Sequence, residues 1–258
     1  MDADQSLVLM DRNHRYCTVL TLNRPAKRNA LTIDLMEILS DMIEDIQKLP
    51  EQRAIIFKGA GSIFCAGLDL AEAEDASLEE KSSKSVGRLL KTIDECPLIT
   101  IAAIHGAALG GGAGIMCACD LALAESETAF GFPETRRGMV AAQIMPFLIR
   151  LLPQRLLHEL LFLGETIESH RAYEIGLINK IAKTYSSLPD ALKYVESIAK
   201  GAPKATARTK KLMHQLQSVN FQEGLKLGFD LHRETRRNDE FIEGIQAFRE
   251  KRPPHWNP

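Results

Sequence analysis

Hydrophobic and polar positions alternate between two periods along the chain. In CTVLTLNRP (17–25) β-branched residues alternate with other types before Asn-Arg-Pro, which predicts a strand that runs into a turn. Behind Thr32, a candidate N-cap, apolar residues recur at helical spacing and predict a helix. These apolar residues are Leu35, Ile38, Leu39, Met42, Ile43 and Ile46.

A unit of strand, glycine-rich turn and helix recurs weakly in the first part of the chain. Strands followed by glycine turns are predicted within residues 53–67 and 98–106, and an apolar helix within about 111–118. Residues 120–134 predict a further strand and turn. Because the repeated units share one pattern, they indicate successive turns of one α/β scaffold rather than independent domains.

The remaining segments divide the chain into two parts. The charged segment 72–85 predicts a mobile surface loop or a frayed helix, and a helix follows at about 86–95. A strand is predicted within residues 177–183, and helices are predicted from there to residue 258. We therefore expect an α/β core over residues 1–187 and a helical region over 188–258.

Composition and charge favour a small-molecule function. The 258 residues carry 32 basic and 34 acidic side chains, so no overall field attracts nucleic acid or an anionic membrane. The first residues are acidic rather than basic, and no apolar run approaches the roughly 18 residues of a membrane span. The sequence therefore predicts a cytoplasmic protein with neither nucleic acid nor a membrane as a partner.

The cysteines indicate reduced thiols in the core. Their number is odd and most of them lie within apolar runs, as expected of reduced thiols in a reducing compartment rather than of disulfide bonds. No histidine or further cysteine lies near Cys117 and Cys119 at the spacing of a zinc site, so no metal is expected. The five are Cys17, Cys65, Cys96, Cys117 and Cys119.

Glycine-rich turns after two strands are candidates for an anion site. IFCAGLDL (63–70) and IHGAALGGGAGIM (104–116) both let the backbone bend sharply and expose N–H groups, and two such groups facing one oxygen form an oxyanion hole. A phosphate-binding loop would need a lysine after its glycines, and none follows here. A dinucleotide-binding motif would need a glycine at its last position, where residues 110–115 have Ile115. Tight packing of small residues is the alternative interpretation.

A third strand end carries a candidate acid or base. In FGFPE (130–134), Glu134 directly follows a proline, and Arg136 and Arg137 come next. Taken alone, Glu134 is compatible with an ordinary surface acid. The two arginines either pair with it or are solvated.

Six motifs follow one another in order along nearly the whole chain. They are LNRPAKRNAL (22–31), FCAGLDL (64–70), IAAIHGAALGGG (101–112), CDLALA (119–124), FGFPE (130–134) with Gly138-Met139 behind it, and EGIQAFREKRPPHW (243–256). In this order they resemble the enoyl-CoA hydratase/isomerase family, the crotonase superfamily. The resemblance implies a ββα spiral core, a helical C-terminal trimerisation region, and a homo-oligomer that is a trimer or a dimer of trimers.

The resemblance also implies a role for each matching residue. The anion would be the enolate oxygen of an acyl-CoA thioester, held by the backbone N–H groups of Ala66 and Gly111, with Glu134 as the acid or base. Coenzyme A is then part of the substrate, and no metal, flavin or nicotinamide is implied. Residues expected to bind CoA or the acyl group are Ala26, Lys27, Arg28, Leu68, Asp69, Gly114, Met139, Phe248 and Lys251, of which Phe248 and Lys251 would reach the CoA of a neighbouring subunit.

One departure from the family pattern bears on the reaction. Hydratases of this family typically use two glutamates, and the position of the first is Gly114 here. One carboxylate suffices for a Δ3-Δ2-enoyl-CoA isomerase, whereas a dienoyl-CoA isomerase needs an acid where Ala142 stands. Because ETRRGMVAAQIMPFLIRLL (134–152) resembles hydratases of branched-chain degradation, such as methylglutaconyl-CoA hydratase, we favour hydration of a 2-enoyl-CoA. An acyl-CoA hydrolase, a decarboxylase and a non-catalytic CoA-binding protein remain alternatives.

Overall fold

The computed structural model describes residues 6–257, so the acidic residues 1–5, on which the expected cytoplasmic location partly rests, lie outside it. The chain divides into two compact units, the first ending at Lys193 and the second beginning at Tyr194. Helix α8 (Ser187–Ile198) contains this boundary, and the predicted boundary at 187/188 falls at its first turn. Among the helices of the described chain, none is long and apolar enough to cross a bilayer.

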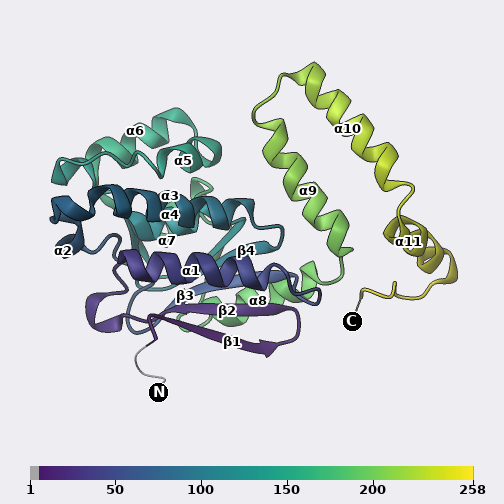
Figure 1. Ribbon diagram of the computed structural model, residues 1–258, viewed down its shortest axis with the longest axis horizontal. Coiled ribbons are helices and arrows are strands. Elements are labelled where there is room, and N and C mark those ends of the chain that lie inside the picture. Colours follow the sequence, from purple (N-terminus) through teal and green to yellow (C-terminus); the bar gives the residue numbers. More distant parts are fainter. Residues whose placement is uncertain (1–5, 258) are drawn as a thin grey trace. The chain divides into compact units, whose positions relative to one another are not determined.

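The first unit is built on a six-stranded sheet in the order β1-β2-β3-β4-β6-β9, of which Figure 1 labels the first four strands. Strand β1 is antiparallel to β2, and all other neighbours are parallel. Parallel strands covered on both faces are apolar at successive positions, which explains why β3 and β4 read as continuous apolar runs. The strands are β1 (Val8–His14), β2 (Cys17–Leu22), β3 (Ala54–Gly59), β4 (Ile99–Ile104), β6 (Leu121–Glu125) and β9 (Lys180–Ala182).

A second sheet of three strands stands beside the first, in the order β5-β7-β8. Its strands are β5 (Ala107–Leu109), β7 (Ala129–Gly131) and β8 (Thr166–Glu168). The chain passes from the large sheet at β4 to the small sheet at β5, returns at β6 and passes again at β7. The predicted strand and turn within 120–134 are therefore two strands in different sheets, and this alternation is the spiral that positions the site.

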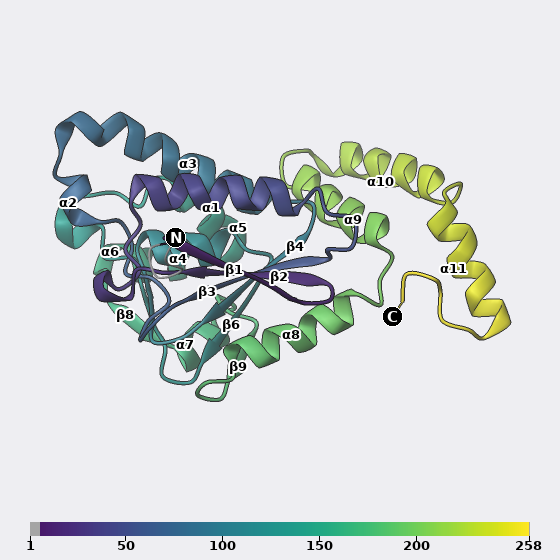
Figure 2. The same ribbon diagram turned by 60° about the horizontal axis from the view of Figure 1, so that its bottom comes forward.

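Helices α1 (Ile33–Ile46) and α3 (Glu79–Glu95) lie side by side on one side of the larger sheet, with α7 (Ser169–Glu174) on the other (Figure 2). The predicted cap of α1 is confirmed, because Thr32 Oγ1 accepts a hydrogen bond from the Leu35 N–H at 3.3 Å. On α3, the Arg88 guanidinium pairs with three carboxylates of α1, at 2.6–2.9 Å. These contacts fix α3 against α1.

The charged segment 72–85 is helical at twelve of its fourteen residues, which favours the helix over the surface loop among the two expectations for this segment. The segment contains the end of α2 (Leu70–Ala73), a 3₁₀ turn at Ala76–Leu78 and the first seven residues of α3. Ser85 is buried and donates a hydrogen bond to Glu37 at 2.5 Å. The sequence left a loop and a helix open here because the segment is rich in charged side chains that contact α1 or face solvent, so little apolar periodicity could be detected.

The other helices complete the two units. In the first unit they are α4 (Gly111–Ala118), which confirms the predicted apolar helix, α5 (Met145–Leu151) and α6 (Gln154–Leu163). The second unit holds α9 (Pro203–Leu216), α10 (Phe221–Thr235) and α11 (Asp239–Glu250). The predicted helical character of the C-terminal part is therefore confirmed.

Asn29 ties its own turn, at residues 24–30, to the loop that follows β3. It is fully buried with a φ of 53°, a left-handed conformation that asparagine tolerates better than most residues. Its amide nitrogen donates to the carbonyls of Ala60, Ile63 and Phe64, at 2.8–3.1 Å, and its Oδ1 accepts from the Arg24 N–H. One side chain thus satisfies four backbone groups.

We predict that Asn29→Ala lowers the free energy of unfolding by about 2–4 kcal/mol, since buried backbone groups would lose their partners. Asn29→Asp should cost at least as much, because a carboxylate cannot donate to the three carbonyls. Urea denaturation measures both, with the exposed Asn13→Ala as the matched control. A loss in Asn29→Ala no larger than that of the control would contradict the assigned role.

Candidate active site

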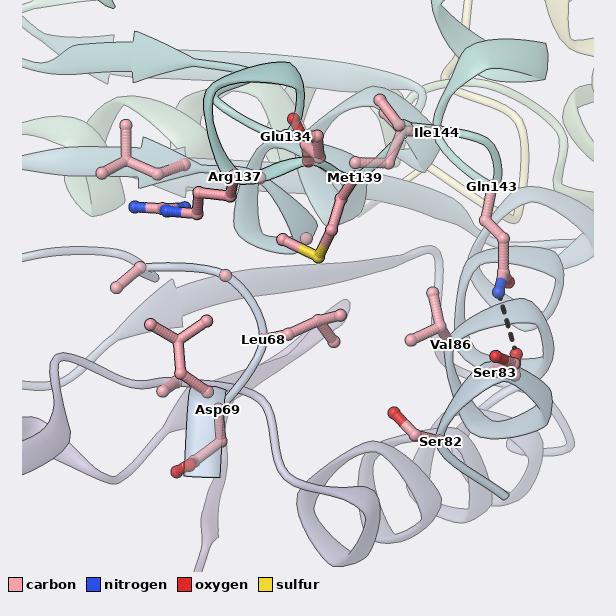
Figure 3. A pocket seen from close by; sticks show the side chains of 18 of the residues that line it. Leu68, Asp69, Ser82, Ser83, Val86, Glu134, Arg137, Met139, Gln143 and Ile144 are labelled. Atoms are coloured by element: carbon pink, nitrogen blue, oxygen red, sulfur yellow. Dashed lines mark hydrogen bonds between the residues drawn. The ribbon is translucent and has the colours of Figure 1, made fainter. Parts of the chain in front are cut away.

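A pocket of about 690 Å³ lies in the first unit, where the ends of several elements meet. Its walls come from the turn at 27–30, the loop 66–71, helix α3 at 82–86, the start of α4, and the segment 134–144. Figure 3 shows Leu68, Met139 and Val86 around its centre. Eight of the predicted site residues line it, namely Lys27, Arg28, Ala66, Leu68, Asp69, Gly111, Glu134 and Met139.

The start of α4 lies directly against the loop that follows β3. A Cβ on Gly112 would stand 2.7 Å from the Cβ of Cys65, so only glycine permits this approach. The loop also pairs with β5, because the Leu109 N–H donates to the Cys65 carbonyl at 3.0 Å. The first N–H groups of α4 therefore face loop 66–68, at the positive end of the helix.

The free donors in this loop differ from those predicted. The Ala66 N–H is not free, because it donates to the Arg28 carbonyl at 3.0 Å. Within residues 6–257, the N–H groups of Leu68 and Gly111 donate no hydrogen bond. The structure thus corrects the predicted pair of donors from Ala66 and Gly111 to Leu68 and Gly111.

The correction has a local cause that the sequence does not display. Leu68 forms a parallel bridge with Leu31, in which the Leu31 N–H donates to the Gly67 carbonyl and the Asp69 N–H donates to the Leu31 carbonyl. In a parallel bridge the middle residue directs its own N–H to the opposite side. The nitrogen of Leu68 stands 3.6 Å from where a Cβ on Gly111 would be, so the two free N–H groups are neighbours.

Glu134 presents a carboxylate with an unsatisfied oxygen to the pocket. Its Oε2 is buried and has no hydrogen-bond partner in the described chain, while its Oε1 lies against Gly110, 3.2 Å from the position of a Cβ there. Burial raises the pKa of this carboxyl, and the Arg137 guanidinium opposes that rise. A buried carboxylate oxygen without a hydrogen-bond partner is costly to folding, which is typical of a group kept for function.

Where the family pattern has another glutamate, this chain has Gly114, and a neighbouring side chain takes up the space. Gly114 is buried inside α4 and does not line the pocket. A Cβ on Gly114 would lie 3.1 Å from Cγ1 of Ile144 and 3.6 Å from a methyl group of Leu90. Gly114, which was expected among the residues that bind CoA or the acyl group, therefore does not line this pocket, and Ile144 lines it at this point instead.

The predicted CoA-binding turn lies at one side of the pocket. Lys27 and Arg28 are exposed lining residues, whereas Ala26 is exposed but does not line it. Asp69 forms an ion pair with Arg24 at 2.9 Å and caps α2, and the Arg24 hydrogen bond holds the pKa of this carboxyl below its usual range. The Asp69 side chain is thus engaged in fixing the loop.

Other candidate residues lie apart from this chemistry. Arg136 pairs with Glu165 at 3.2 Å, so of the two arginines only Arg137 lines the pocket. Phe248 and Lys251 belong to the second unit, where Phe248 is 83% exposed and Lys251 ends α11 in a left-handed conformation. Their contact with a neighbouring subunit's CoA stays a prediction.

All five cysteines are buried, and burial raises the pKa of the Cys17 and Cys65 thiols to about 12. Over residues 6–257, no group of three or more histidine, cysteine or acidic side chains is arranged to hold a metal ion. The chemistry available in the pocket is therefore that of Glu134, two free N–H groups and nearby cations.

Known proteins of similar fold share this architecture. An enoyl-CoA hydratase/isomerase from Marinobacter aquaeolei is 30% identical, with a TM-score of 0.90 and coverage of 98% of this chain and 99% of that one. Such agreement over nearly the whole of both chains confirms the predicted crotonase-type α/β fold.

Sequence comparison leads to the same family. A Thermus thermophilus protein provisionally named an enoyl-CoA hydratase is 34% identical over 97% of this chain and all of its own. The mitochondrial methylglutaconyl-CoA hydratase of Mus musculus is 29% identical over 96% of this chain and 81% of its own. The family profile described as enoyl-CoA hydratase/isomerase matches residues 13–258. The chain therefore belongs to the enoyl-CoA hydratase/isomerase family.

Proposed function

We propose that this protein is an enoyl-CoA hydratase that adds water to a 2-enoyl-CoA thioester. The observation that carries the proposal is the unpartnered, buried oxygen of Glu134 in the same pocket as the free N–H groups of Leu68 and Gly111. A base and an oxyanion hole are the two parts that this addition needs. The hydratase names of the Thermus and mouse relatives support the same reaction.

The addition can proceed with one carboxylate. Glu134 takes a proton from water as the water oxygen attacks C3, and the double-bond electrons move through C2 toward the thioester oxygen. The N–H groups of Leu68 and Gly111 stabilise the resulting enolate, with each such donor contributing about 3–4 kcal/mol to lowering the barrier. The protonated Glu134 then gives its proton to C2 and the thioester carbonyl re-forms.

Isomerisation of a 3-enoyl-CoA is the second candidate, and the packing of Ile144 against Gly114 favours it. With no second carboxylate at this point, Glu134 could remove a proton from C2 and return it at C4 without water. The same oxyanion hole would hold the dienolate. The remaining alternative functions are those of a thioester hydrolase, a decarboxylase and a non-catalytic CoA-binding protein.

The substrate is proposed to be an acyl-CoA, with Lys27 and Arg28 close to its phosphates. Both cations are exposed at the pocket, and neither forms an ion pair with another residue between 6 and 257. Lys251 of a neighbouring subunit would add a further contact. The N–H groups, Glu134 and these cations need no metal or other cofactor in the proposed reaction.

Labelled water distinguishes the two candidate reactions. The protein is incubated with short 2-enoyl-CoA and 3-enoyl-CoA thioesters in ¹⁸O-labelled water, and product masses are followed. We expect the 2-enoyl-CoA to gain one labelled water. A product of unchanged mass with a moved double bond would contradict hydration and establish isomerisation. Unchanged substrates despite CoA binding would reject both.

We also propose that the protein assembles as a trimer or a dimer of trimers. The second unit exposes large apolar side chains that an isolated subunit would leave in water, which supports burial between copies. Light scattering should therefore give a mass several times the 28.7 kDa of one chain, and a stable monomer would contradict the proposal. The exposed side chains include Met213, Phe221, Leu225, Phe229, Ile242 and Phe248.

A further inference from the structure

A side-chain bridge closes one side of the pocket. Gln143 Nε2 donates a hydrogen bond to the Ser83 carbonyl in α3, at 3.1 Å. Both residues line the pocket, one from the segment 134–144 and the other from α3. Figure 3 shows the bridge spanning these two walls beside Val86.

Gly87 provides the space in which the bridge lies. It is in the middle of α3, where glycine is less favourable than alanine, and a Cβ there would stand 3.0 Å from the Gln143 Oε1. The amide of Gln143 therefore packs over a gap in the helix surface. Its donor is fixed on Ser83 and its acceptor side lies against Gly87.

The bridge is opposite the charged side of the pocket. Figure 3 shows Arg137 and Asp69 on one side and the Gln143–Ser83 pair on the other. Arg28 belongs to the charged side, because its carbonyl accepts from the Ala66 N–H at the loop that leads to Asp69. The phosphates of CoA are polyanionic and favour that side, which leaves the side near Val86 and Gln143 for the acyl group.

The walls on either side of the bridge are held by contacts of their own. Ile144 packs onto Gly114 and Leu90 immediately next to Gln143, and α3 is held to α1 by the ion pairs of Arg88. Both walls are therefore fixed by packing independent of the bridge. Removing the Gln143 side chain would open this side without releasing α3.

We propose that Gln143 is a specificity-determining residue that closes the acyl end of the pocket and restricts the substrate to short acyl groups. The inference rests on the proposed function in taking the ligand to be an acyl-CoA. The Gln143–Ser83 hydrogen bond, which lies against Gly87, blocks the pocket at this end, so the acyl chain must end before it.

Binding of saturated acyl-CoA thioesters tests this without any turnover. Calorimetry gives the affinity of the full-length protein for butanoyl-CoA and decanoyl-CoA, for the wild type and for Gln143→Ala. We expect the variant to raise the decanoyl-to-butanoyl affinity ratio by about tenfold or more, the gain from burying about two further methylenes. An unchanged ratio would overturn the proposal.

Two further variants separate the bridge from a general loosening of the fold. Gly87→Ala requires the end of the Gln143 side chain to shift by a few tenths of an ångström, so it should raise the ratio in the same direction but by less, and add nothing in the Gln143→Ala background. Gln154→Ala, at an exposed glutamine that starts α6, is the matched control and should leave the ratio unchanged. A rise in the control, or no rise in Gly87→Ala, would count against the bridge.

Failure of the proposed reaction would be visible separately. If no enoyl-CoA is turned over but Gln143→Ala still changes the affinity ratio, hydration is rejected and the chain-length limit stands. If turnover is found and the ratio does not respond to Gln143→Ala, hydration stands and the chain-length limit is overturned.

Discussion

The close contact between the first turn of α4 and Cys65 is the constraint on which the pocket depends. Gly112 permits it because a Cβ there would overlap the cysteine. The contact holds the start of α4 beside loop 66–68, and the hydrogen bond from Leu109 to Cys65 fixes the register. Two backbone N–H groups from distant parts of the sequence are thereby brought together without a partner.

The electrostatics of the pocket follow from this arrangement. An oxyanion hole needs donors that are left free in the resting protein, and a base needs a carboxylate whose pKa is not held low by ion pairs. Burial raises the pKa of Glu134, and the Arg137 guanidinium opposes that rise. The unsatisfied Oε2 of Glu134 costs stability, because a buried polar atom has lost water without gaining a hydrogen bond.

Patterns that depend on local chemistry were predicted well from the sequence. The helix behind Thr32, the apolar helix after the glycine run and the α/β class all follow from hydrophobic period and capping. The crotonase resemblance supplied the positions of Glu134 and Gly111, both of which line the pocket.

Features that depend on which backbone group meets which neighbour could not be predicted. Ala66 and Leu68 are two residues apart on one loop, and only the bridge with Leu31 decides which N–H remains free. Likewise, Gly114 indicates a missing carboxylate, but the sequence does not say that Ile144 fills the space.

The most direct test of this account is the pH dependence of kcat/KM for the wild type and Glu134→Gln. Because its pKa is raised, wild-type Glu134 should lose its activity as a base when the pH falls through a value above the usual 4.5 of glutamate. The variant should be slower by about 10²-fold or more and lack this acid limb, while CoA affinity and the exposed control Glu127→Gln stay unchanged. Wild-type turnover in Glu134→Gln, or the same acid limb, would contradict the central role of this carboxylate.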